Sequence, residues 1–221
     1  MIAVSKKFIK TIIYSFFLII ITLLLVLAVS LIIIDYKPKE LEQAKHKIYD
    51  SSLKQDVFFN KEISILSWNI GYAGLGKDEN FFFDGGKEVR PKSKEIIEKY
   101  LQGICKTLND IPSDIYLLQE VDEDSKRSYH MDQKQVLLEQ LKMDYYFAYN
   151  YCCLYVPFPL PPIGKVMAGV TTFTNFNTLQ STRYSLPVSF KWPISIANLK
   201  RCLLINRIPI NGSDKELIII N

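Results

Sequence analysis

Residues 11–34 form one uninterrupted apolar run, TIIYSFFLIIITLLLVLAVSLIII, without a charged side chain, a glycine or a proline. At 1.5 Å rise per residue, a helix of this length covers roughly 36 Å, and the hydrocarbon core of a bilayer is about 30 Å thick. A helix that is apolar on every face is typical of a membrane span and rare in the core of a soluble domain. We therefore predict one transmembrane helix over residues 11–34, followed by a water-soluble domain.

A cleaved secretory signal is the alternative interpretation of the same run. Such signals have a shorter apolar core, with small residues at a cleavage site after it. Here the small residues Ala28 and Ser30 lie inside the run, and residues 31–34 continue it. An uncleaved anchor is therefore the favoured interpretation.

Basic residues flank the run on both sides. Lys6, Lys7 and Lys10 belong to a basic tail of residues 1–10, and four lysines lie between residues 37 and 47. The positive-inside rule counts Lys and Arg within about 15–20 residues of each end, so the two groups nearly balance. Because the first group lies closer to the helix, we favour the amino terminus inside and the domain outside.

The net charge of +4 comes mainly from the tail. Three of the 27 basic residues and none of the 23 acidic ones precede residue 11, which leaves 24 basic and 23 acidic residues after it. A domain so close to neutral lacks the basic surface of a general nucleic-acid binder.

The cysteines indicate neither a disulfide framework nor a zinc site. The chain has Cys105, Cys152, Cys153 and Cys202, without a Cys-x-x-Cys pair, and its two histidines form no His-Glu-x-x-His motif. A disulfide-stabilised domain has a denser cysteine pattern in a shorter chain. We expect buried free thiols.

Periodicity divides the rest of the chain into a tether and an α/β domain. Residues 35–61 are polar and charged, and we expect a tether that is partly helical over residues 40–49. In the domain of residues 62–221, the run 62–70 predicts a buried strand, and the apolar spacing of residues 93–109, with Ser93 as N-cap, predicts a helix. A buried strand over 114–120 and a helix over 132–141 follow. The later strand candidates are residues 145–151, 166–173, 182–190, 200–208 and 215–221.

A strand, a helix and a second strand form a βαβ unit, whose two strands lie parallel in one sheet. Asn69 lies near the carboxyl end of the first strand and Glu120 at the carboxyl end of the second. Ligands bind at this side of α/β sheets. A carboxylate among oxygen ligands suits Mg²⁺, which often binds together with a substrate phosphate. A solvated residue at a strand boundary is the alternative interpretation of Glu120.

Two motifs resemble the endonuclease/exonuclease/phosphatase superfamily, which includes deoxyribonuclease-I-like nucleases, inositol-phosphate phosphatases and neutral sphingomyelinases. They are Leu66-Ser67-Trp68-Asn69-Ile70 and, about fifty residues later, residues 114–121 (DIYLLQEV). Residues 169–174, 202–208 and 217–221 resemble later strands of that family. Asn69-Ile70-Gly71-Tyr72 with Asp84-Gly85-Gly86 resembles its membrane-anchored bacterial branch, which implies a bacterial cell membrane.

The resemblance implies a fold and two site residues. The fold is α/β, a deoxyribonuclease-I-like sandwich of two sheets with outer helices, preceded here by one transmembrane helix. Glu120 matches the metal-binding Glu of the family, and Asn69 matches the Asn beside the metal and the scissile phosphate. The implied cofactor is Mg²⁺ or another divalent cation. The implied substrate is a phosphoester, either nucleic acid, a lipid headgroup or a small phosphoester, and no obligate protein partner is evident.

No Asp-x-Asn with the surroundings of the family's later motif and no terminal Asp-His is found in this sequence, so the fold is expected to be incomplete, cut to its N-terminal half. His130 lies too early to match the terminal His, and His46 lies in the expected tether. The sequence therefore indicates a membrane-anchored, metal-dependent phosphoester hydrolase in truncated form. The alternative is a non-catalytic membrane-anchored binding protein or a decayed pseudoenzyme.

Overall fold

The computed structural model describes residues 6–221, in two compact units that divide between Tyr36 and Lys37. The first unit contains one helix, α1 (Lys6–Ile34). Within it, Lys10–Ile34 has a mean hydropathy of 3.4 and no side chain buried against the rest of the chain, so its length and composition are those of a membrane span. A signal sequence can have the same length and composition. Residues 1–5 of the expected basic tail lie outside the described residues, whereas Lys6–Lys10 belong to α1.

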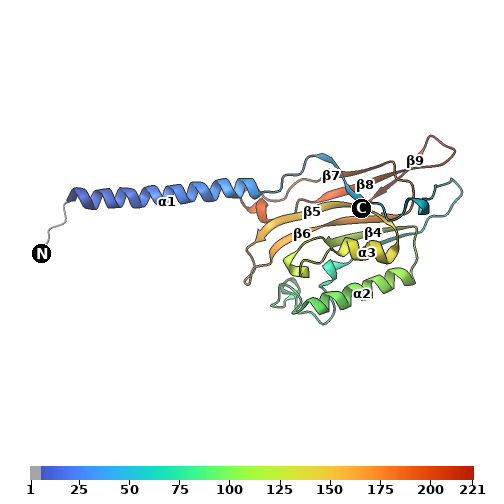
Figure 1. The fold of residues 1–221 in the computed structure, drawn as a ribbon, viewed down its shortest axis with the longest axis horizontal. Coiled ribbons are helices and arrows are strands. Elements are labelled where there is room, and N and C mark those ends of the chain that lie inside the picture. Colours follow the sequence, from blue (N-terminus) through green and yellow to red (C-terminus); the bar gives the residue numbers. More distant parts are fainter. Residues whose placement is uncertain (1–5) are drawn as a thin grey trace. The chain divides into compact units, whose positions relative to one another are not determined.

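The second unit, Lys37–Asn221, is a two-layer sandwich of β-sheets with two helices on its outer side (Figure 1). Short 3₁₀ turns are at Ser51–Leu53, Gly71–Ala73, Phe82–Asp84, Lys126–Ser128 and Ile194–Ala197. The helices and strands are β1 (Leu41–Gln43), β2 (Lys45–Lys47), β3 (Ile65–Asn69), α2 (Lys94–Asp110), β4 (Ile115–Asp122), α3 (Gln133–Leu141), β5 (Asp144–Val156), β6 (Gly164–Thr174), β7 (Gln180–Ser185), β8 (Cys202–Pro209) and β9 (Glu216–Ile220).

One sheet has the strand order β1-β7-β8-β9 and the other β2-β5-β6-β4-β3. The strands β3 and β4 are parallel, with Ile65 opposite Ile115 and Asn69 opposite Gln119, while the other pairs are antiparallel. The predicted βαβ unit and the predicted two-sheet α/β sandwich are therefore confirmed.

The apolar core has two parts, one between the helices and the five-stranded sheet and one between the two sheets. Outside the five-stranded sheet, Ile97, Leu101 and Leu108 of α2 pack with Leu118 of β4 and Leu137 of α3. These helix positions repeat every three to four residues, which turns one apolar stripe toward the sheet. Between the sheets, the buried residues come from both layers: Val57, Ile115, Phe176, Ile208 and Ile219 form one cluster, and Ala44, Tyr146, Ala148, Val170, Cys202 and Leu204 another.

The strand β3 is an edge strand with no fully buried residue, so the prediction of a buried strand here is wrong. Its side chains alternate: Leu66 and Trp68 pack against the α2 cluster, whereas Ser67 and Asn69 are exposed on the other face. The residues of this strand have β4 as their one neighbour in the described sheet. The polar Asn69 therefore points away from the helix layer, into the space beside the inner face.

The expected tether is partly wrong. Residues 41–47 are two short strands rather than a helix, and β1 joins one sheet while β2 joins the other. Ala44, between them, is buried, and its N–H donates to the Ser181 carbonyl at 3.0 Å. Because these strands are only three residues long, they have no periodicity that a sequence reading can detect. This segment ties the two sheets together and belongs to the folded domain.

Candidate metal and phosphoester site

Glu120 lies at an irregularity of β4. The pairing of β4 with β6 shifts between Leu118 and Val121, so that two residues of β4 oppose one residue of β6. Glu120 itself has a φ of +54°, a left-handed conformation that non-glycine residues seldom adopt. Bulges of this kind re-aim a side chain and are common beside active sites. The strain of such a residue, on the order of 1 kcal/mol, persists where the surrounding structure holds it in place.

The structure brings the two predicted site residues together. The Asn69 Nδ2 donates to Glu120 Oε1 at 3.0 Å, and Asn69 Oδ1 accepts a hydrogen bond from the Gly71 N–H at 2.9 Å. The amide therefore turns its N–H toward the carboxylate and its oxygen toward its own backbone. In this arrangement Asn69 orients the Glu120 side chain, rather than offering a second oxygen to the same cation.

A tight turn closes the site after β3. Gly71, Tyr72 and Ala73 all have positive φ, of 53°, 44° and 51°. Tyr72 is fully buried, and its carbonyl accepts a hydrogen bond from Gln133 Nε2 at 2.7 Å. Burial raises the pKa of the Tyr72 phenol far above its usual range, while the charge of Arg127 opposes that shift. The Tyr72 phenol is thus neutral at physiological pH, and its buried ring forms one side of the site.

A buried ion pair supports this turn. Arg127 donates from Nη2 to Asp122 Oδ1 at 2.9 Å and from Nε to Asp122 Oδ2 at 3.2 Å. Its guanidinium lies 3.9 Å from the centroid of the Tyr72 ring, a cation–π contact. Asp122 is completely buried, so this ion pair lies inside the domain. The sequence offered no periodicity that would have singled out the pair.

Asn221 is a third polar residue of the site that the sequence reading did not single out. Its side chain extends from the end of β9 to the other sheet, where Nδ2 donates to the Thr171 carbonyl at 2.9 Å. Its Oδ1 accepts from Gln119 Nε2 at 2.6 Å. Gln119 directly precedes Glu120, so Asn221 holds the bulge of β4 from the opposite sheet.

His130 belongs to a separate polar group. Its Nδ1 lies 2.5 Å from Asp124 Oδ1, and the other oxygen of Asp124 pairs with Lys165 of β6. Lys165 first, then His130, holds the pKa of Asp124 below its usual value. All three side chains are partly or largely exposed. The Nδ1–carboxylate contact leaves Nε2 of His130 as the outward nitrogen, which is the arrangement of a histidine base.

The donor set fits a cation that takes few protein ligands. Across residues 6–221, no group of three or more His, Cys, Asp or Glu side chains is placed to hold a metal ion. A Zn²⁺ or Ca²⁺ cage is therefore not formed by the described residues. Mg²⁺ keeps several waters and uses one or two carboxylates together with substrate phosphate, so Glu120 suits it as a single protein ligand.

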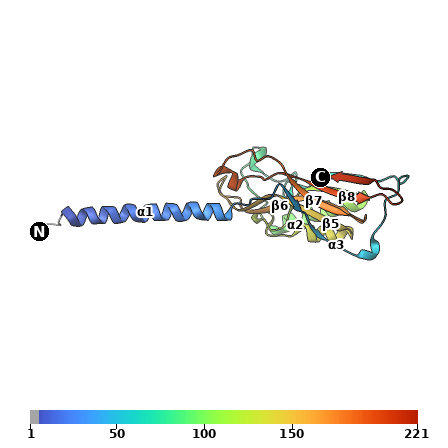
Figure 2. The same cartoon turned by 90° about the horizontal axis from the view of Figure 1, so that it is seen from above.

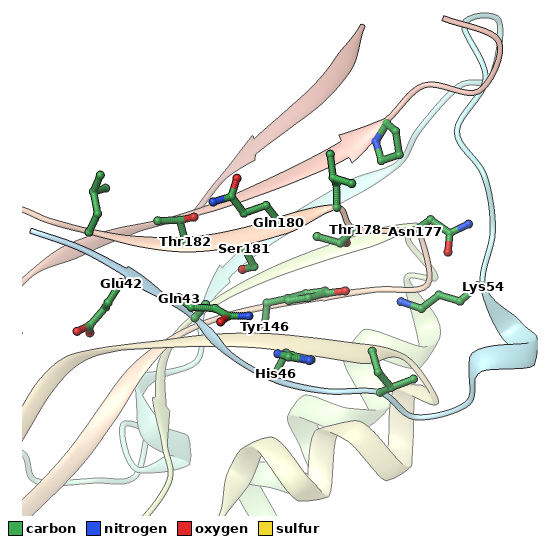
Figure 3. Close-up of a pocket in the computed structure, with 15 residues that line it drawn as sticks. Glu42, Gln43, His46, Lys54, Tyr146, Asn177, Thr178, Gln180, Ser181 and Thr182 are labelled. Atoms are coloured by element: carbon green, nitrogen blue, oxygen red, sulfur yellow. The ribbon is translucent and has the colours of Figure 1, made fainter. Parts of the chain in front are cut away.

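A separate cleft lies at the other edge of the sandwich (Figure 3). It has a volume of about 810 Å³ and is lined by β1, β2 and β7 rather than by Asn69 or Glu120. There the His46 ring stacks on Tyr146 with 6.1 Å between centroids, and Lys54 lies at one end. His46, which was expected in the tether, is thus part of β2. The cleft follows the crossing of the chain from one sheet to the other.

Known proteins match this chain in structure. No protein-family model matches it, and no curated protein matches it in sequence. An endonuclease/exonuclease/phosphatase from Beutenbergia cavernae DSM 12333 is 18% identical with a TM-score of 0.48, over 72% of this chain and 37% of that protein. A family protein from Leptotrichia buccalis C-1013-b is 18% identical with a TM-score of 0.43, over 72% of this chain and 54% of that protein.

A third match is ANGEL2, described as a 2′,3′-cyclic phosphatase, at 16% identity and a TM-score of 0.43 over 81% of this chain and 43% of that protein. The proteins from Beutenbergia cavernae and Leptotrichia buccalis carry the superfamily name that the motifs indicated. The chain spans about half of their length or less. At such identities the matches are likenesses of fold, and the fold described above rests on the strand order and register.

Proposed function

We propose that this chain provides the metal side of a phosphoester hydrolase, with Glu120 as the ligand of a Mg²⁺ or similar divalent cation and Asn69 as its partner. The observation that supports this most directly is the hydrogen bond between Asn69 and Glu120 at a strained bulge. When bound, the cation would neutralise charge on a phosphoryl oxygen and help to generate the attacking hydroxide.

We also propose that α1 anchors the protein as a single span in a bacterial cell membrane, with the domain on the outer face. Its length and apolar composition support this. The nearly neutral domain favours a surface phosphoester or a lipid headgroup over bulk nucleic acid, and the substrate within the phosphoester class stays open. The motifs supply no base that matches the Asp-His of the family. A non-catalytic binding protein or a decayed pseudoenzyme is the alternative function.

Hydrolysis of bis-p-nitrophenyl phosphate tests the catalytic proposal. The full chain in detergent is compared with Mg²⁺ and with EDTA, as wild type, as Glu120→Gln and, for a matched control, as Glu98→Gln on the exposed side of α2. Because the sequence has no Asp-His and no Asp-x-Asn with the surroundings of the family motif, we expect no metal-dependent turnover from residues 1–221. A longer form that contains such motifs should hydrolyse the ester with Mg²⁺ and lose that activity with Glu120→Gln alone.

Two outcomes would change this account. Mg²⁺-dependent turnover that Glu120→Gln leaves intact contradicts the assignment of the metal ligand. Turnover by residues 1–221 that needs both Mg²⁺ and Glu120 shows that a base lies within this chain. In that case His130, with its Nδ1 on Asp124, is the first candidate.

A further inference from the structure

Two loops with apolar tips lie side by side at one end of the domain. The first, residues 154–163, joins β5 to β6, and the second, residues 186–199, joins β7 to β8. Both Figures 1 and 2 show them at the same end of the two sheets. The Tyr151 hydroxyl donates to the Ala197 carbonyl at 2.9 Å, and the Lys200 N–H donates to the Asn150 carbonyl at 2.8 Å. These bonds hold the bases of the two loops against each other.

The tips of both loops expose large apolar side chains. Phe158 and Leu160 in the first loop are 71% and 80% exposed, and Trp192 and Ile194 in the second are 51% and 61% exposed. Phe190 adds another ring at 50%. Single exposed apolar residues are ordinary, but a group of this kind on adjoining loops marks an interaction surface.

The charged residues within the sequence of these loops and the strand segments next to them have one sign. From residue 145 to residue 213 the sequence contains no Asp or Glu, whereas it contains six Lys and Arg. Lys191 lies inside the second loop, Lys200 and Arg201 follow it, and Lys165, which pairs with Asp124, follows the first loop. Apolar and aromatic tips with basic neighbours match the interface of a bilayer that contains anionic lipids.

The chain enters the domain at the same end. Only Asp35 and Tyr36 separate the end of α1 at Ile34 from Lys37, where the second unit begins. The Ser185 hydroxyl then donates to the Lys39 carbonyl at 2.7 Å, and the Ser185 N–H donates to the Glu40 carbonyl at 2.8 Å. Ser185 ends β7, and the second loop begins at the next residue. An anchor ending at Ile34 would therefore keep both loops within a few residues of the membrane surface.

The other end of the domain lacks this combination. Phe59 is 60% exposed there, close to the turn after β8, because Val57 pairs with Ile210. Charged residues of both signs surround it in sequence, including Asp56, Lys61 and Glu62. Phe59 therefore serves as a matched control for the loop tips.

We infer that the two loops dock on the bilayer that α1 spans, with Phe158, Leu160 and Trp192 among the lipid headgroups and upper acyl chains and Lys191 against anionic phosphates. The inference rests on the anchoring part of the proposed function and not on its catalytic part. The strand β4 runs antiparallel to β6, so its carboxyl end, with Glu120, points toward the end of the domain that carries the first loop. Docking would thus turn the candidate site toward phosphoesters at the membrane surface.

Tryptophan fluorescence can test the docking, because the chain has only Trp68 and Trp192. The full chain is reconstituted into vesicles of phosphatidylcholine and phosphatidylglycerol, with or without phosphatidylcholine brominated near the top of its acyl chains, and recovered by flotation. We expect the brominated lipid to quench the wild type and to leave Trp192→Phe unchanged, since Trp68 packs beneath α2. The double variant Phe158→Ser/Leu160→Ser should also lose quenching, and Phe59→Ser should keep it.

A separate experiment tests the contribution of Lys191 to docking. Removing one lysine near an anionic surface lowers the binding constant about fivefold, so Lys191→Gln should lower the equilibrium constant for docking by about that factor in anionic vesicles and not in neutral ones. Far-UV circular dichroism of each variant excludes unfolding. If the chain floats with the vesicles and resists carbonate extraction but is not quenched, docking is wrong and the anchor stands. If the chain does not float at all, both the anchor and the docking are wrong.

Discussion

The buried pair of Arg127 and Asp122 gives the sharpest test of how the site is held. Asp122 is 0% exposed and Arg127 is 13% exposed, with two hydrogen bonds between them. Removing one partner of a buried pair leaves an unpaired charge and costs about 3–5 kcal/mol. We therefore predict that Arg127→Met lowers the free energy of unfolding by that amount, a large fraction of the total of about 5–15 kcal/mol typical of a domain.

The pair can also be replaced as a whole. Changing both partners to apolar residues of similar size is often neutral for stability, because neither charge is then left unpaired. The double variant Asp122→Leu/Arg127→Met should therefore be more stable than Arg127→Met alone. Urea unfolding of the full chain in detergent, followed by Trp68 emission in a Trp192→Phe background, measures both.

A matched cation on the surface serves as the control. Lys94 pairs with Glu98 at 3.2 Å, and both side chains are about half exposed. Such pairs contribute about 0.3–0.5 kcal/mol, so Lys94→Met should change little. If Arg127→Met destabilises no more than Lys94→Met does, the argument that this ion pair supports the Tyr72 turn is refuted.

Three further predictions concern stability and reactivity. Lys165 lowers the pKa of Asp124 below 3.8, so this carboxylate stabilises the fold above about pH 3.8, and the stabilisation is lost as the pH falls through the pKa of Asp124 in the folded state. In thermal melts, Asp124→Asn should therefore cost under about 1 kcal/mol at pH 7 and nothing at pH 2. A Cβ on Gly169 would lie 2.1 Å from a backbone oxygen of β5, whereas a Cβ on Gly103 would meet no atom within 4 Å. Gly169→Ala should therefore destabilise the fold by about 1–3 kcal/mol, and Gly103→Ala should stabilise it by about 0.5–1 kcal/mol; equal melting temperatures for the two variants would contradict this. Burial raises the pKa of the Cys105 thiol, so iodoacetamide should modify it at pH 7 only after unfolding, as measured by mass spectrometry.

The elements that sequence reading predicted well have strong local signals. The apolar stripe of residues 93–109 gave α2 to within one residue, with Ser93 at the N-cap position, and Asp132 caps α3 by accepting from the Gln135 N–H. The free and largely buried cysteines were also expected, and they are confirmed. Each of these features depends on residues close in sequence.

The features that sequence reading missed depend on distant residues. The crossing of residues 41–47 between the sheets is visible only once β5 and β7 are placed. The β7 candidate extended to Phe190, but the strand ends at Ser185, two residues before Pro187, where the chain turns toward the second apolar loop. The bulge at Glu120 is likewise a property of its pairing with β6, and the inter-sheet bond of Asn221 joins residues more than one hundred positions apart.

Asn69 and Glu120 combine a feature that the sequence predicts with one that it does not. The proximity of Asn69 and Glu120 followed from a βαβ unit, because parallel strands end at one edge of a sheet. The direction of the Asn69 amide did not follow, since it is fixed by the Gly71 N–H in a turn of three positive-φ residues. Sequence therefore predicted which residues meet, and the structure shows which atoms do.

The central claim is that Glu120 binds a divalent cation, and Mn²⁺ titration of the full chain, followed by the electron paramagnetic resonance signal of the free ion, tests it most directly. We predict saturable binding below about 10 mM that Mg²⁺ displaces and that Glu120→Gln abolishes, with Glu98→Gln equal to wild type. Binding that is unchanged in Glu120→Gln, or the lack of saturable binding in the wild type, would contradict the account.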